Sequence, residues 1–176
     1  MKRVLVIVIL ASFAFIFGCK REMVIPEIKD SFLKYYGESG NDAAFDLKVL
    51  SDGGFVFAGY TTTKLGDKNA YIAKANQYGY IEWSKSVGGD LDDQFNEMLL
   101  GSDEIYAIGT SEDSLTGNNI RLNVYNYSGD EILDTVYIRN DNQEGKSIIK
   151  LNSGLVIGGS TTSAGQQFKW RQIGLQ

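Results

Sequence analysis

The sequence repeats itself at a spacing of fifty residues, and this feature constrains the fold more than any other. Residues 54–61 read GFVFAGYT, and the segments fifty and one hundred residues later read EIYAIGTS (104–111) and GLVIGGST (154–161). One position is identical in all three segments and is occupied by Gly59, Gly109 and Gly159. Repeats of this length indicate an array of one small structural unit, so we expect three copies of one motif.

The same spacing aligns residues on both sides of these segments. The aligned sets are Asp42 with Asp92 and Asn142, Phe45 with Phe95, Asn69 with Asn119, Asn76 with Asn126, and Gly79 with Gly129. Chance supplies one such match, whereas a whole set at one spacing indicates that the three copies share one fold.

The first repeat carries the signals of four short strands. Phe45, Leu47 and Val49 alternate with polar residues, which predicts a half-buried strand with these side chains on its buried face. The turn-forming residues 51–54 (SDGG) favour a tight hairpin, and the continuously apolar stretch 55–59 predicts a strand covered on both faces. Further strands are expected over residues 69–75 and 81–87. Four antiparallel strands in about fifty residues are typical of one β-propeller blade, so the chain is expected to be all-β.

The first repeat also resembles a known family. The motifs DGGF (52–55), AGYT (58–61), IEW (81–83) and GG (88–89), together with Lys74 and Gly79, resemble one blade of a family of bacterial cell-envelope β-propellers. The resemblance covers residues 31–176 and weakens after the first repeat, where Leu133 replaces Trp83 and Glu104 replaces the second glycine of the turn. It implies a secreted or lipid-anchored binding or scaffold module, and it brings no catalytic residues.

The domain expected over residues 31–176 holds about three blades, with repeats near 38–87, 88–137 and 138–176. Residues 31–37 resemble the fourth strand and its exit, while the last repeat stops after its third strand, so residues 31–37 are interpreted as a closing strand. Propellers usually have four to eight blades. The domain is therefore expected to be partial, completed by missing sequence, or completed by two copies that exchange the strand Ser31–Tyr36 in a six-bladed homodimer.

The N-terminus resembles the signal of a bacterial lipoprotein. Two basic residues precede residues 4–17, which are apolar except for Ser12. This run is shorter than the roughly 20 residues of a bilayer span and fits the core of a secretory signal. The segment IFGC (16–19) resembles a lipobox, which implies that residues 1–18 are removed, that Cys19 is lipidated, and that residues 19–30 form a tether. An uncleaved anchor and an ordinary signal peptide are the alternatives.

Composition excludes several classes of activity. The chain has no histidine and one cysteine, which excludes a Ser-His-Asp triad, a Cys-His nucleophile and a metal centre of several Cys or His ligands. Its 17 basic and 22 acidic residues give a net charge of −5, which disfavours nucleic-acid binding. No cofactor is expected, and the N-terminal lipid, not a basic patch, is expected to provide the membrane contact.

Two groups of residues are candidates for a binding site. Asp90, Asp92 and Asp93 form the densest acidic cluster, but the central glycine and closing glutamate of a Ca²⁺-binding loop are absent. A solvated turn is therefore preferred, and no metal site is expected. Aromatic residues form the second group, for which carbohydrate stacking and packing between blades both stay open: Tyr60, Tyr71, Tyr78, Tyr80 and Trp83.

The expected function is that of a lipid-anchored β-propeller-type binding module without catalytic activity, facing the periplasm or the exterior of a bacterial cell envelope. Its ligand is expected to be a protein or a glycan. One alternative is a hydrolase of envelope glycans or peptides that uses acidic loop residues, although the sequence fixes no separation between two carboxylates. The other alternative is an inactive fragment of a longer propeller protein.

Overall fold

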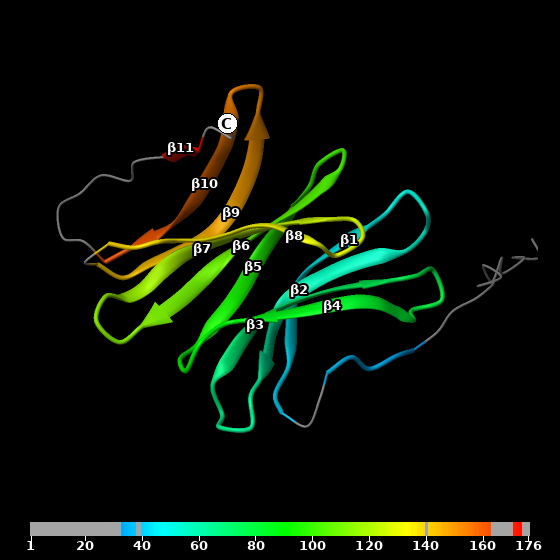
Figure 1. The fold of residues 1–176 in the computed structure, drawn as a ribbon, viewed down its shortest axis with the longest axis horizontal. Coiled ribbons are helices and arrows are strands. Elements are labelled where there is room, and N and C mark those ends of the chain that lie inside the picture. The colour runs from blue at the N-terminus through cyan, green and yellow to red at the C-terminus, as the bar shows by residue number, and fades with distance from the viewer. Residues whose placement is uncertain (1–32, 38–39, 140, 163–170, 174–176) are drawn as a thin grey trace, which may run out of the picture. The chain divides into compact units, whose positions relative to one another are not determined.

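The computed structural model describes residues 33–37, 40–139, 141–162 and 171–173, the last of these as backbone only. These residues form strands and their connections, with no helix among them (Figure 1). The described part of the chain therefore holds no helix that is long and apolar enough to cross a membrane. The prediction of an all-β chain is confirmed. The predicted signal peptide, Cys19 and the tether lie outside the described residues.

The strands form three antiparallel sheets. The first sheet has the order β1 (Ala43–Val49), β2 (Phe55–Thr62), β3 (Lys68–Ala75), β4 (Ile81–Val87). The middle sheet has the order β5 (Asp93–Leu100), β6 (Glu104–Asp113), β7 (Gly117–Asn126), β8 (Glu131–Tyr137). The third sheet has the order β9 (Gln143–Leu151), β10 (Gly154–Thr161), β11 (Arg171–Ile173). The strands predicted over residues 69–75 and 81–87 correspond to β3 and β4.

The register of β1 differs by one residue from the spacing of the sequence repeat. Ala44 lies opposite Gly59, whereas Phe95 lies opposite Gly109. Ala44 therefore occupies the place of Phe95, and Phe45 is the extra residue of a β-bulge in β1. The prediction that Phe45 and Phe95 correspond is wrong.

The cause of this shift is the length of the first hairpin. Residues 50–54 connect the last paired residues of β1 and β2, whereas residues 101–104 make the same connection between β5 and β6. The extra residue displaces all of β1 by one position, so Asp42 corresponds to Asp93 and not to Asp92.

The three aligned glycines lie beside these bulges. A Cβ atom on Gly59, Gly109 or Gly159 would lie 1.8, 1.9 or 1.8 Å from a backbone oxygen of the neighbouring strand. The neighbouring residues are Ala43, Gln94 and Glu144. Two backbones therefore approach closely at each of these glycines, and the approaching strand belongs to the same sheet and not to an adjacent one.

The same turn joins β3 to β4 and β7 to β8. Gly79 and Gly129 have φ of 73° and 88°, a left-handed conformation that glycine adopts without steric cost. The side-chain oxygen of Asn76 accepts hydrogen bonds from the amides of Tyr78 and Tyr80, and Asn126 repeats this arrangement in the middle sheet. These asparagines hold the turn closed from within.

Two apolar clusters join the sheets. In the first, side chains of the first and middle sheets pack together: Val56, Ala58, Ala70, Ile72, Phe95, Met98, Ile105, Ala107 and Tyr125. In the second, side chains of the middle and third sheets pack together: Tyr106, Ile108, Leu122, Val124, Ile148, Leu155 and Ile157. The middle sheet is therefore covered on both faces.

Equivalent hydrogen bonds also join neighbouring sheets. The amide of Met98 on β5 donates to the Asp46 carboxylate on β1 at 2.8 Å, and the amide of Ile148 on β9 donates to the Glu97 carboxylate on β5 at 2.6 Å. Each carboxylate lies beside the bulge of its strand. Both junctions between sheets therefore use one arrangement of carboxylate and backbone amide.

The middle sheet also buries an ion cluster. Arg121, whose side chain is 8% exposed, contacts one oxygen of Asp93 at 3.4 Å and both oxygens of Asp134 at 2.9 and 3.0 Å. Its Nε donates to Asn123 at 3.0 Å. A planar guanidinium suits such a site because it presents several fixed donors.

Candidate functional site

The first sheet has one packed face and one face that no other described sheet covers. We call the second face the outer face. It is formed by alternate residues of β1, β2 and β3: Leu47, Val49, Phe55, Phe57 and Tyr71. Leu47 is 56% and Val49 71% exposed. Exposed apolar residues grouped in this way mark interaction surfaces in folded proteins.

This arrangement corrects the prediction for β1. The predicted strand is present, but Leu47 and Val49 point outward, while Asp46 lies on the face that meets the middle sheet, where it binds the Met98 amide. Alternation in a sequence shows that the two faces of a strand differ, but it does not show which face another sheet will cover.

The segment Leu33–Gly37 lies against the outer face without forming a strand. The Tyr36 ring lies 4.9 Å from the Phe57 ring and 6.3 Å from the Phe55 ring, measured between centroids. Its hydroxyl donates to the backbone oxygen of Gly79 at 2.9 Å. Burial raises the pKa of this hydroxyl, so it stays protonated and remains a donor.

A second contact holds the same segment. The Lys34 ammonium lies 3.3 Å from the centre of the Tyr80 ring, within the range of a cation–π interaction. In its described residues 33–37, the segment interpreted as a closing strand forms no strand. Its described part lies over the first sheet, whereas Ser31 and residue 32 lie outside the described residues.

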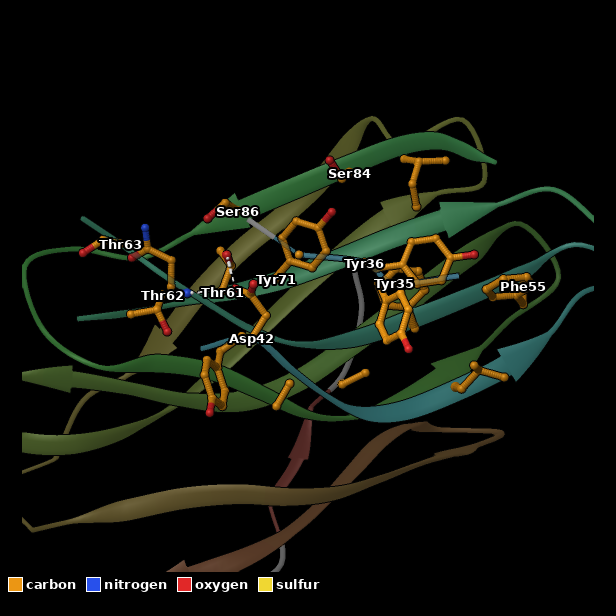
Figure 2. Close-up of a pocket in the computed structure, with 18 residues that line it drawn as sticks. Tyr35, Tyr36, Asp42, Phe55, Thr61, Thr62, Thr63, Tyr71, Ser84 and Ser86 are labelled. Atoms are coloured by element: carbon orange, nitrogen blue, oxygen red, sulfur yellow. Dashed lines mark hydrogen bonds between the residues drawn. The ribbon is translucent and has the colours of Figure 1, made fainter. Parts of the chain in front are cut away.

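An open groove of about 810 Å³ runs along the outer face (Figure 2). Rings of Tyr36 and Phe55 line it toward one end, and the Phe57 ring, which packs against Tyr36, also lines the groove. Hydroxyl groups and one carboxylate line it toward the other end, where Figure 2 shows Thr61, Thr62, Thr63, Ser86 and Asp42. The groove therefore offers an apolar wall and a polar end to a partner.

The carboxylate of Asp42 is held in place at the polar end. One of its oxygens accepts hydrogen bonds from the Thr61 hydroxyl at 2.6 Å and from the Thr62 amide at 3.1 Å. The Thr61 hydroxyl and the Thr62 amide both donate to this oxygen, so the carboxylate stabilises the end of β2.

The structure divides the aromatic residues selected from the sequence. Tyr60 and Tyr71 line the groove, and Tyr80 contacts Lys34 beside it. Tyr78 lies in the turn after β3 and is 58% exposed. Trp83 lies on the packed face of the first sheet, where its Nε1 donates to the backbone oxygen of Tyr127 at 3.1 Å. Trp83 is thus a packing residue.

Sequence reasoning missed Tyr36, Phe55 and Phe57 among the residues of the groove. Phe55 and Phe57 belong to a stretch that was expected to be covered on both faces by other strands, but on the outer face it is the Tyr36 ring that lies over them. Tyr36 itself was assigned to a closing strand. The alternation of aromatic residues at positions 55 and 57 was the available signal for a distinct aromatic face.

Of the three aspartates proposed as a weak metal candidate (Asp90, Asp92 and Asp93), Asp92 and Asp93 have separate partners. Asp92 pairs with the Lys68 ammonium at 2.9 Å, and its other oxygen accepts the Lys68 amide. Asp93 accepts the amide of Gly89 and contacts Arg121. Within the part of the chain that the structure describes, no three Asp, Glu, Cys or His side chains are grouped as metal ligands.

No protein-family model matches the chain, and no significant match is found among curated proteins. The resemblance to cell-envelope propellers and to lipoproteins therefore stays a prediction, and the functional argument depends on the geometry of the outer face.

Proposed function

We propose that this chain is a lipid-anchored module of the bacterial cell envelope that binds or scaffolds a partner through the outer face of its first sheet. The observation that carries the proposal is the outer face itself, where apolar residues of β1 are more than half exposed beside an aromatic groove. A monomeric soluble protein rarely leaves such a surface uncovered.

We further propose that the three sheets are consecutive blades of a β-propeller. Two observations support this arrangement. Four-stranded antiparallel sheets follow one another along the chain, with β4 and β8 beginning fifty residues apart. The same carboxylate–amide hydrogen bond occurs at both junctions between sheets, as expected when one unit is added repeatedly in one orientation.

The proposed anchor depends on the sequence pattern that ends at Cys19. The run of residues 4–17, apolar except for Ser12, is followed by Gly18 and then by the only cysteine of the chain, whose thiol would accept the lipid. Because acylation needs that thiol, the variant Cys19→Ser is expected to accumulate as a precursor that incorporates no radiolabelled palmitate. Equal labelling of Cys19→Ser and the unchanged chain would refute the anchor.

The proposed interaction surface is tested by photo-crosslinking the full chain in the cell envelope. A benzophenone amino acid replaces Leu47 on the outer face, and in a control chain it replaces Leu115, which is 92% exposed in the connection between β6 and β7. We expect a discrete adduct from position 47 and none from position 115. Absence of an adduct at position 47, or the same adduct from both positions, would contradict the proposal.

A further inference from the structure

The outer face of the first sheet corresponds to the faces through which the other two sheets are packed. Residues that lie opposite each other on the first two strands of each sheet identify the corresponding positions. These pairs are Leu47 and Phe57 in the first sheet, Met98 and Ala107 in the middle sheet, and Ile148 and Ile157 in the third. In the middle and third sheets these side chains are buried against the preceding sheet. The outer face of the first sheet is therefore equivalent to the faces on which the middle and third sheets pack against a preceding sheet.

The backbone of β1 supports the same correspondence. In β5 and β9 the amides of Met98 and Ile148 donate to a side-chain carboxylate of the preceding sheet. The register gives Leu47 the equivalent position in β1, because Leu47 lies opposite Phe57 as Met98 lies opposite Ala107. The amide of Leu47 thus stands where a preceding sheet would supply an acceptor.

The far face of the third sheet presents the complementary half of this junction. Ile149 and Leu151 on β9 are 53% and 47% exposed. Ile149 lies opposite Val156, as Leu99 lies opposite Tyr106 in the middle sheet. Leu99 and Tyr106 pack against the third sheet, so the equivalent residues of the third sheet are shaped to pack against another sheet.

The third sheet also has an acceptor at the required place. Asp46 lies opposite Ala58 and Glu97 opposite Ile108, and the equivalent residue of the third sheet is Ser147, opposite Gly158. Ser147 is exposed, and its hydroxyl oxygen is able to accept a hydrogen bond from a backbone amide.

The segment Leu33–Gly37 contacts the first sheet as β4 contacts the middle sheet. The Tyr36 hydroxyl donates to the backbone oxygen of Gly79 in the turn after β3, and Trp83 of β4 donates to Tyr127 in the corresponding turn after β7. The segment therefore holds the place of a fourth strand of a preceding sheet. The third sheet has three strands in the described part of the chain, with β11 as its outer one.

We propose that the β9–β11 sheet of a second copy packs on the outer face of β1–β4, with β11 of that copy beside Leu33–Gly37. The reciprocal contact follows from two-fold symmetry, so two copies close a ring through two identical junctions. A second copy is the fitting partner because one chain carries both halves of the junction, including the acceptor and the amide. This inference rests on the proposed function, for which it names the partner of the outer face.

The mass of the full chain in density-matched detergent, measured by sedimentation equilibrium, tests this inference. We expect twice the protein mass of one chain. Leu47→Asp and Ile149→Asp, which place a charge in the two halves of the junction, are each expected to give the mass of one chain. Leu115→Asp, in an exposed connection, is the control and is expected to keep the doubled mass. A single-chain mass without substitution, or a doubled mass that persists in both variants, would overturn the inference.

A gain of affinity provides a second readout that a folding defect would not produce. Ser147→Asp places at this junction a carboxylate like those of the other two junctions, so it is expected to lower the dissociation constant of the dimer at least threefold. Ile149→Asp adds the same charge two residues away and is expected to have the opposite effect. Ser128→Asp, in the exposed turn after β7, is its control and is expected to change nothing. Weaker association of Ser147→Asp would count against the register of the docked sheet.

The crosslinking experiment separates this inference from the proposed function. An adduct of twice the chain mass from position 47 supports the second copy. An adduct of another mass from a chain that sediments as a monomer overturns the second copy while it leaves the proposed interaction surface in place. A doubled mass in a chain that takes up no lipid supports the docking and contradicts the anchor.

Discussion

The first and middle sheets have the same strand order but bury their side chains differently. Met98 in the middle sheet is 1% exposed, whereas Leu47, at the equivalent place in the first sheet, is 56% exposed. The middle sheet lies between two others, and the first sheet is covered by another described sheet on one face only. Burial in this molecule therefore depends on the position of a sheet in the series as well as on its sequence.

The two sheets also differ in the polar residues at equivalent places. Arg121 lies opposite Gly109 in the middle sheet and binds Asp93 and Asp134. Tyr71 lies opposite Gly59 in the first sheet and lines the groove. In the middle sheet, the buried charges of this cluster pair with one another. In the first sheet, the outer face carries an aromatic ring and hydroxyl groups instead.

The largest expected effect comes from breaking the ion cluster of the middle sheet. Arg121→Met leaves the carboxylate of Asp93, which is 2% exposed, buried without its cation. The free energy of unfolding is expected to fall by about 4 kcal/mol in a urea titration. Tyr71→Met, at the equivalent place in the first sheet, is the control and is expected to cost less than about 1.5 kcal/mol. Equal losses would show that the two places are energetically alike.

The difference in burial is tested directly by truncating the two equivalent side chains. Met98→Ala is expected to lower the free energy of unfolding by about 3 kcal/mol, because it leaves a cavity between two sheets. Leu47→Ala is expected to cost less than about 0.5 kcal/mol, because the side chain is exposed within one copy. Both are measured in the Ile149→Asp background, so that self-association does not contribute. A large loss for Leu47→Ala in that background would contradict the assignment of an uncovered face.

The glycines beside the bulges are expected to respond alike in both sheets. Gly59→Val and Gly109→Val each force a side chain against the backbone of the neighbouring strand in the same sheet. Each is therefore expected to lower the free energy of unfolding by about 2 kcal/mol. If contacts between sheets set the cost, the Gly109 variant would lose much more than the Gly59 variant, because only the middle sheet is covered on both faces.

The smallest effect is expected at the loop between the two sheets. The hydrogen bond from Lys68 holds the pKa of Asp92 below its usual value. The pair therefore stabilises the fold above the ordinary pKa of an aspartate, and this contribution disappears as the pH falls through the lowered pKa. Asp92→Asn is expected to cost less than about 1 kcal/mol at neutral pH, because both side chains are partly exposed, and nothing in strong acid.

The third repeat provides the control for this effect. Asn142 already accepts the amide of Asn118 at the equivalent place, without a lysine. Asn142→Asp is therefore expected to gain no comparable stability at neutral pH. Urea titrations of both variants at neutral and acidic pH measure the difference, and a loss for Asp92→Asn that is independent of pH would contradict the role assigned to its charge.

Part of the candidate site could be predicted from the sequence. Tyr60 and Tyr71 belong to the aromatic group for which the sequence leaves ligand stacking and packing between blades open, and both line the groove. Tyr36, Phe55 and Phe57 were not selected, because their role depends on the segment Leu33–Gly37, which lies against the sheet without forming a strand. Trp83 was selected with the first group, yet it packs under the turn that contains Gly129. Aromatic character predicts burial of a ring but not the surface that buries it.

The sequence by itself determined the strands, the turns and the bulge glycines of this protein. Period-2 alternation and the Asn76–Gly79 turn act over a few neighbouring residues, so their signals are local. The glycine at position 59 is required by the neighbouring strand, and its signal in the sequence is its recurrence at positions 109 and 159. The tertiary structure alone decided the one-residue shift of β1, the pairing of Arg121 with Asp93 and Asp134, and the exposure of Leu47. These features depend on hairpin length and on which sheet lies against which face, and such contacts join residues that no local pattern relates.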